Sequence, residues 1–343
     1  MPTNPVMIPR AAAPAQTPAW QQALARAIAD PHELLRRLGL EPSLLQDMES
    51  GDALFRTRVP ESYLARIRPG DPRDPLLLQV LPQAAEADDH PAFVTDPVGD
   101  ADAMAAPGLL HKYRGRVLLV TTGACAIHCR YCFRRGFPYG EFSAARDWRP
   151  ALDYIAGHPD VTEVILSGGD PLTLPDTRLA NLLRQLEAIP HVRRLRIHSR
   201  VPIVLPERVD DGLLSWVGQG RLDQVLVLHA NHPREFEAPV DGALARLRAT
   251  GITLLNQSVL LAGVNDDLDT LCQLQEVGFA AGVLPYYLHL LDRVRGATHF
   301  DVDEARARAL HDAMRVRLPG YLLPRLVREV PGAPTKTPAE RAP

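Results

Sequence analysis

Three cysteines lie close together in the sequence and are its clearest candidates for chemistry. Cys125, Cys129 and Cys132 follow the spacing C-x3-C-x2-C. Three thiolates on one short segment can converge on one metal centre. A [4Fe–4S] cluster takes four ligands, so three cysteines would leave one iron open to a ligand from outside the protein. A structural zinc site would need a fourth protein ligand, and His128 could supply it only by folding back between two cysteines. The spacing therefore favours an iron–sulfur cluster.

Lysine is rare in this chain, although basic residues are not. Of the 38 lysine and arginine residues, only Lys112 and Lys336 are lysine. A position that stays lysine can require an amine that loses its proton, which arginine cannot provide. Lys336 lies in a segment rich in proline and glycine near the C-terminus, where a solvated tail residue is the ordinary alternative. The composition therefore makes a lysine a candidate for covalent chemistry.

Composition excludes several broad classes of protein. The chain has 343 residues, 46% of them hydrophobic, and a net charge of -3, which argues against a generic binder of nucleic acids or membrane surfaces. No apolar run approaches the roughly 18 residues of a membrane span. The first residues, 1–19, lack a basic start followed by an apolar stretch, so no secretion signal is predicted. We therefore expect a cytoplasmic protein.

The chain divides into four segments by pattern. We expect a flexible tail over 1–19, an N-terminal helical extension with an acidic connector over 20–105, a βα core over 106–300, and a C-terminal part over 301–343 with a helix, a strand and the Lys336 segment. This division places the cysteines at the start of the core.

Six short apolar runs in the core alternate with helical patterns, which predicts parallel βα units. The predicted strands are Arg116–Thr122, Val161–Ser167, Arg194–Ser199, Gln224–His229, Thr253–Leu260 and Val283–Leu288. The predicted helices are Arg178–Ile189, Gly242–Thr250, Leu268–Ala280 and Val302–Val316. Polar residues follow five of the strands, as at the catalytic rim of a βα barrel. No G-x-G-x-x-G follows the first strand, so a dinucleotide site is not predicted.

The sequence CAIHCRYC directly after the first strand resembles the radical S-adenosylmethionine superfamily. This resemblance implies an α/β fold, a partial (βα)6 barrel, with the open iron of a [4Fe–4S] cluster chelating S-adenosylmethionine. A glycine-rich turn at the end of the second strand matches the superfamily's turn for the methionine amino group. The residues that the resemblance assigns to S-adenosylmethionine are Ser167, Gly168, Gly169, Asp170 and His229.

Longer segments are similar to the lysine 2,3-aminomutase family, from about Trp20 to Pro338. They include HKYRGRVLLVTTGACAIHCRYCFRR, ILSGGDPL, RIHSRVPIVLPERV, HANHP, LLNQSVLLAGVND, PYYLHLLD and GYLLPRLVREVPGAPTK. The resemblance implies an isomerase that uses pyridoxal 5′-phosphate with S-adenosylmethionine to convert L-lysine to β-lysine. The ending PTKTP is most similar to the branch that makes (R)-β-lysine for elongation factor P.

The same resemblance assigns roles to single residues. Lys336 matches the Schiff-base lysine, and Arg134 matches the residue that pairs with the substrate α-carboxylate. Asp292 and Glu329 match the carboxylates for the distant ε-ammonium, although Glu329 stands where the catabolic enzymes have Asp. The residues matched to the cofactor phosphate are Arg116 and Gln257.

The resemblance also implies partners and leaves alternatives. An electron donor of the flavodoxin or ferredoxin type, elongation factor P and its β-lysine ligase are expected partners. The catabolic enzymes carry zinc on a longer C-terminal tail, and we expect no zinc here; Cys272 is expected to be a buried apolar residue. The alternatives are an aminomutase for another amino acid, a radical enzyme without pyridoxal phosphate, and a metal-binding module without activity.

Overall fold

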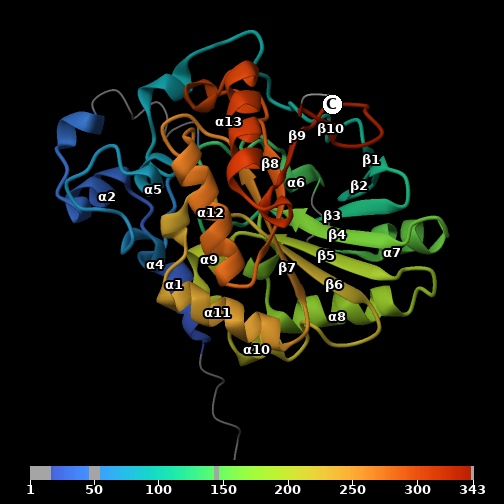
Figure 1. The fold of residues 1–343 in the computed structure, drawn as a ribbon. Coiled ribbons are helices and arrows are strands. Elements are labelled where there is room, and N and C mark those ends of the chain that lie inside the picture. The colour runs from blue at the N-terminus through green and yellow to red at the C-terminus, as the bar shows by residue number, and fades with distance from the viewer. Residues whose placement is uncertain (1–16, 46–54, 143–146, 341–343) are drawn as a thin grey trace, which may run out of the picture.

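The fold is built on one ten-stranded sheet, in which the strands lie side by side in the order of the sequence. The computed structural model describes residues 17–45, 55–142 and 147–340. Strands β3 to β9 are all parallel, and the two outer strands before them and the one after them are antiparallel (Figure 1). The sheet does not close, which confirms the prediction of a partial barrel.

The six predicted strands are the six central strands of the sheet. Two of them have the predicted bounds, and the others differ by one or two residues at one or both ends. The strands are β1 Met104–Ala106, β2 Leu109–Tyr113, β3 Arg116–Thr122, β4 Glu163–Gly168, β5 Arg194–Ser199, β6 Asp223–Leu228, β7 Thr253–Val259, β8 Leu284–His289, β9 Arg325–Arg328 and β10 Thr337–Pro338. The short antiparallel strands β1 and β2, just before the first predicted strand, were not expected.

Helices cover the outer side of the sheet (Figure 1). The crossover helices are α7 Arg149–Ala156, α8 Asp176–Glu187, α11 Ala238–Ala249, α12 Leu268–Ala280 and α13 Glu304–Arg317. The short helices of the core are α6 Tyr139–Phe142, α9 Val201–Val204 and α10 Asp211–Leu214. Helix α12 has the predicted bounds, whereas α7 has no counterpart among the predicted helices.

The N-terminal extension forms short helices beside the core. They are α1 Ala19–Ala25, α2 Pro31–Leu38, α4 Glu61–Leu64 and α5 Pro75–Leu78. The carboxylate of Asp30 accepts a hydrogen bond from the backbone N–H of His32, which caps the start of α2. The predicted tail over 1–19 lies, apart from residues 17–19, outside the described residues.

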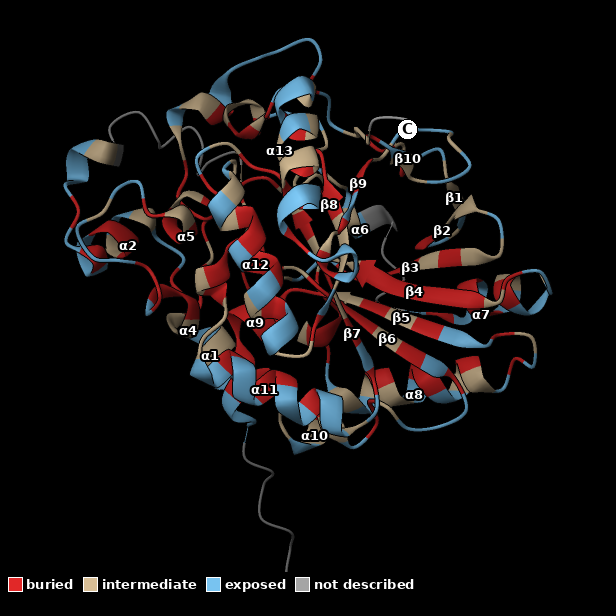
Figure 2. Ribbon diagram, viewed as in Figure 1, coloured by how far each residue is buried: buried red, intermediate tan, exposed pale blue. Residues whose placement is uncertain are grey.

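The parallel strands are buried, and each outer helix has one buried face and one exposed face. Every residue of β4 except its last is buried, and the outer helices turn an exposed face to solvent (Figure 2). Cys272, on α12, is fully buried in a smaller apolar cluster, as expected. None of the helices in the described part of the chain has the length and apolar character needed to cross a membrane.

Candidate active site

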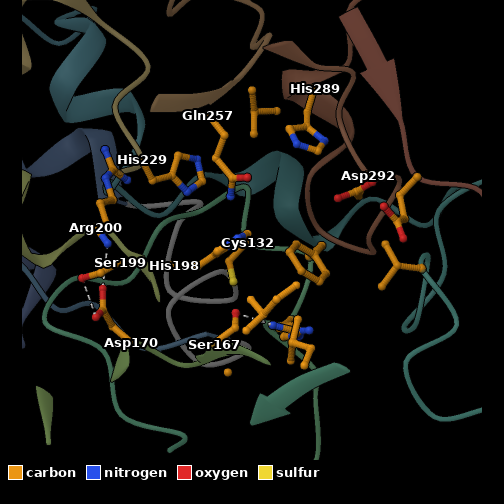
Figure 3. Close-up of a pocket in the computed structure, with 18 of the residues that line it drawn as sticks. Cys132, Ser167, Asp170, His198, Ser199, Arg200, His229, Gln257, His289 and Asp292 are labelled. Carbon is orange, nitrogen blue, oxygen red and sulfur yellow. Dashed lines mark hydrogen bonds between the residues drawn. The ribbon is translucent and has the colours of Figure 1, made fainter. Parts of the chain in front are cut away.

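One large pocket opens at the carboxyl ends of the central strands. Its lining includes every residue that the sequence analysis assigned to a site. These are Arg116, Cys125, Cys129, Cys132, Arg134, Ser167, Gly168, Gly169, Asp170, His229, Gln257, Asp292, Glu329 and Lys336. In Figure 3, Gln257, His289 and Asp292 lie across the pocket from Ser167 and Asp170. Side chains separated by up to 220 residues of sequence thus meet in one cavity.

The loop after β3 carries the three cysteines, and the N-terminal extension holds it in place. The backbone N–H of His128 donates to the carbonyl of Arg58 at 3.0 Å, and that of Arg130 donates to the carbonyl of Gln79 at 2.9 Å. The side chain of Arg130 forms a 2.5 Å ion pair with Glu86, and both side chains are fully buried. The cysteine loop is therefore fixed from outside the core.

The cysteine thiols suit a cluster of several irons. Burial raises the pKa of the Cys125 thiol well above its usual value, and burial together with Cys129 raises that of Cys132 to about 11. Such thiols become thiolates only when a positive centre compensates the charge. In the described ranges, no three His, Cys, Asp or Glu side chains converge as ligands of a single metal ion would. Cysteines that each bind a different iron of a [4Fe–4S] cube need no such convergence.

The glycine-rich turn at the end of β4 packs directly against the cysteine loop. Gly168 has φ +117°, a conformation that other residues rarely adopt. A Cβ on Gly169 would lie 2.3 Å from the carbonyl oxygen of Ala124, so only glycine fits at this contact. The carboxylate of Asp170 accepts hydrogen bonds from the hydroxyl of Ser199 and from the backbone N–H of Arg200. Asp170 therefore ties the turn to the end of β5.

Burial keeps three histidines at the strand ends in the neutral form, and in two of them one ring nitrogen has no hydrogen-bond partner among the described residues. Burial lowers the pKa of His229 to about 3, and it lowers the pKa values of His198 and His289 well below their usual range. These two ring nitrogens are the Nε2 atoms of His198 and His229, both buried and both without a hydrogen-bond partner in the part of the chain that the structure describes. Unpartnered polar atoms on a pocket wall are costly, so they indicate a polar ligand in the pocket.

Arg134 is held by a carboxylate that the sequence analysis did not identify. Its Nε donates to Asp100 at 2.7 Å, and its Nη1 donates to the hydroxyl of Ser167 at 3.1 Å. Asp100 also pairs with Lys112 at 2.6 Å, so one buried carboxylate holds both basic side chains. Burial opposes ionisation of Asp100, but Arg134 and Lys112 together lower its pKa below the usual value.

Lys336 reaches the pocket from the C-terminal segment. Its Nζ lies 2.6 Å from a carboxylate oxygen of Glu329 and 5.9 Å from the centre of the Tyr287 ring. The other carboxylate oxygen of Glu329 accepts a hydrogen bond from the hydroxyl of Tyr113. Burial opposes ionisation of Glu329, but Lys336 and this hydrogen bond lower its pKa below the usual value.

Three further side chains face the pocket without a charged partner in the described residues. Burial raises the pKa of Asp292 to about 7, although the nearby charge of Lys336 opposes this rise. The guanidinium of Arg116 stacks on the ring of Tyr113 at 4.5 Å. Gln257 lies on the pocket wall at β7. A carboxyl, a guanidinium and an amide are therefore available to bind a ligand that carries both positive and negative groups.

Asp100 and Tyr113 were missed by the sequence analysis. Asp100 lies in an acidic, proline-rich connector, where no sequence feature distinguishes it from the neighbouring acidic residues. Tyr113 lies beside Lys112 in the matched segment HKYRGR, and this position could have identified it as a candidate site residue.

Comparisons with known proteins agree with this geometry. The model of the "Radical SAM superfamily" matches residues 119–212, which hold the cysteine loop and the glycine-rich turn. The chain is 49% identical to the L-lysine 2,3-aminomutase of Escherichia coli, over 94% of each chain. It is 46% identical to that of Haemophilus influenzae, over 93% of this chain and 94% of the relative. It is 34% identical to that of Clostridium subterminale, over 93% and 77%. The chain therefore belongs to the lysine 2,3-aminomutase family of radical SAM enzymes, isomerases whose superfamily implies a [4Fe–4S] cluster and S-adenosylmethionine.

Proposed function

We propose that this protein converts L-lysine to (R)-β-lysine with S-adenosylmethionine and pyridoxal 5′-phosphate. The observation that carries the proposal is the presence of Lys336 and the three cysteines on the walls of one pocket. When bound, S-adenosylmethionine at the cluster supplies a 5′-deoxyadenosyl radical, and pyridoxal phosphate spreads the unpaired electron over its ring. The protein must hold the substrate between these two groups and exclude water.

The charges in the pocket fit both ends of lysine. Arg134 can pair with the α-carboxylate through its guanidinium, while Asp292 and Glu329 can accept the ε-ammonium. Holding both ends fixes the carbon chain between them, and this orientation is a large part of the catalytic effect. A glutamate side chain would meet two carboxylates and be repelled.

Lys336 is the residue proposed to carry pyridoxal phosphate. It supplies a primary amine inside the pocket, and Glu329 holds that amine at 2.6 Å. Arg116 and Gln257 are proposed to bind the phosphate, since Arg116 has no carboxylate partner in the described residues. The turn Ser167–Asp170 and His229 are proposed to bind S-adenosylmethionine, and His229 has a buried nitrogen free for a ligand.

The product is proposed to serve the modification of elongation factor P, in which a ligase attaches β-lysine. A small electron donor of the flavodoxin or ferredoxin type would reduce the cluster. The support for this finer assignment is the resemblance of the PTKTP ending to that branch.

The substrate assignment is tested by a panel of amino acids. The reconstituted protein, with both cofactors and dithionite, is incubated separately with L-lysine, L-arginine and L-glutamate, and the products are separated by chiral chromatography with mass detection. We expect (R)-β-lysine from lysine and no isomer from glutamate. A β-amino acid formed from arginine or glutamate but not from lysine would replace the proposal by the alternative substrate.

The role of Lys336 has an internal control in the second lysine. Borohydride reduction of the protein loaded with pyridoxal phosphate fixes the cofactor to its lysine, and peptide mass mapping locates it. We expect the label on Lys336 and none on Lys112, which is engaged by Asp100. A label on Lys112 alone, or no label at saturating cofactor, would refute the assignment.

A further inference from the structure

A buried arginine contacts one of the three cysteine thiols. Arg200, directly after β5, has a side chain only 6% exposed. Its Nη1 donates a hydrogen bond to Sγ of Cys129 at 2.7 Å (Figure 3 shows Arg200 at the pocket wall). The functional assignments above give Arg200 no role, yet it places a positive charge on a thiol proposed to bind iron.

The direction of the guanidinium is fixed by four partners. Nη1 also donates to the hydroxyl of Tyr131 at 2.6 Å. Nη2 donates to the side-chain oxygen of Gln79 at 2.7 Å and to the carboxylate of Glu235 at 2.8 Å. Glu235 is fully buried, and Arg200 lowers its pKa against the opposing effect of burial. The guanidinium of Arg200 thus links the thiol of Cys129 to the buried carboxylate of Glu235.

The backbone of Arg200 is held by the glycine-rich turn. The N–H of Arg200 donates to Asp170 at 2.8 Å, and the hydroxyl of Ser199 donates to the other oxygen of Asp170 at 2.7 Å. The turn proposed to bind S-adenosylmethionine therefore also sets where the guanidinium meets Cys129.

We propose that Arg200 is a positioning residue that, together with Glu235, sets the reduction potential of the iron–sulfur cluster. Reduction adds one electron from the external donor to the cluster and its thiolates. A hydrogen bond and a positive charge at a ligand sulfur stabilise the state with the additional electron, whereas a nearby carboxylate destabilises it. The inference rests on the proposed function, because it requires a cluster at the cysteines.

The test is a potential measurement on the reconstituted full-length protein. Dithionite titration with mediators, followed by electron paramagnetic resonance, gives the ratio of reduced to oxidised cluster at each potential. In Arg200→Met we expect this ratio to fall about tenfold at a fixed potential, which corresponds to a shift of about 59 mV. In Glu235→Gln we expect a shift in the opposite direction, and Arg200→Lys should lie closer to the wild type because it keeps the charge.

Arg208→Met is the matched control. Arg208 is also a fully buried arginine, and its ion pair with Asp176 at 2.7 Å involves no cysteine. Arg208→Met should lower the stability of the protein and leave the reduction potential unchanged. This control therefore shows what a purely structural effect of losing a buried arginine looks like. An unchanged potential in Arg200→Met, or equal shifts of the same sign in Arg200→Met and Glu235→Gln, would overturn the inference.

The possible outcomes separate this inference from the proposed function. If Arg200→Met holds no cluster, Glu235→Gln decides, and a potential equal to that of the wild type refutes the inference. If iron and sulfide analysis finds no cluster in the wild-type protein, the proposed function fails together with it. If the wild type holds a cluster and its reduction potential is the same in Arg200→Met and Glu235→Gln, the proposed function stands and only the role of Arg200 is refuted.

Discussion

Glu329 contacts Lys336 and also lies where the proposed substrate would place its ε-ammonium. Its carboxylate binds the amine of Lys336 at 2.6 Å and also accepts the hydroxyl of Tyr113, while the proposed substrate brings a second ammonium to the same region. In the proposed substrate complex, the ε-ammonium of lysine would take the place of the Lys336 amine at Glu329. One carboxylate could therefore serve the resting enzyme and the substrate complex in turn.

Glu329→Gln should weaken lysine binding selectively. Removing a charged hydrogen-bond partner costs about 1.5–3 kcal/mol, equivalent to roughly a tenfold to hundredfold increase in the dissociation constant for lysine. Binding to the unreduced holoenzyme can be measured by the absorbance of pyridoxal phosphate. L-Norleucine, which lacks the ε-ammonium, is the control and should bind both proteins alike. An equal loss for both amino acids would mean that Glu329 serves only Lys336.

Asp292 should give the reaction a pH dependence near neutrality. Its pKa is raised to about 7 by burial, so the carboxyl of the free enzyme is neutral below that pH and cannot hold an ammonium. As pH rises through about 7 the carboxylate forms, and kcat/KM for lysine should rise to a plateau, because this parameter reports groups of the free enzyme.

The control for this profile is Asp292→Asn. The pocket histidines do not titrate near neutrality, since the pKa values of His198, His229 and His289 are all lowered. The variant should have a lower kcat/KM without the rise near pH 7. If the rise persists unchanged in Asp292→Asn, another group is responsible and Asp292 does not bind the ε-ammonium.

At the scale of elements, the N-terminal extension acts as a clamp on the cysteine loop. Gln79, Glu86 and Arg58 come from this extension, and each bonds to the loop through backbone or side chain. The extension therefore supports the loop that carries the three cysteines.

Glu86→Ala should destabilise the contact between the N-terminal extension and the cysteine loop. It leaves Arg130 buried without its carboxylate, and breaking a fully buried pair costs about 3–5 kcal/mol. Denaturant unfolding under anaerobic conditions measures the loss, and iron analysis should show reduced cluster content. Glu33→Ala breaks the exposed pair with Arg36 and should cost less than about 1 kcal/mol. Equal effects of the two substitutions would contradict the role of the clamp.

The elements that sequence could predict are those with a strong local pattern. The β-branched run of β3 and the alternating run of β5 were predicted with their observed bounds. The strands β1 and β2 were not, because they are short and follow an acidic, proline-rich connector without a clear apolar pattern. Asp100 could not be found either, since its burial depends on Lys112 and on Arg134, which is 34 residues away.

At the scale of the whole molecule, the two ends of the open sheet meet at the pocket. β2 lies near one edge and β9 near the other, yet Tyr113 on β2 donates to Glu329 directly after β9. Side chains, rather than backbone pairing, connect these two regions. The C-terminal segment thereby brings Lys336 into the same pocket as the cysteine loop. In the proposed function, this cavity would combine a site for a radical source with an amine for a carbonyl cofactor.

This combination is tested most directly by measuring two products at once in three proteins. Wild type, Cys129→Ala and Lys336→Ala are reconstituted anaerobically and supplied with both cofactors, dithionite and L-lysine, and β-lysine and 5′-deoxyadenosine are quantified. We predict β-lysine only from the wild type, with the cluster retained in Lys336→Ala and lost or impaired in Cys129→Ala. β-Lysine from Lys336→Ala at the wild-type rate, or none from a wild-type protein with an intact cluster, would contradict the account.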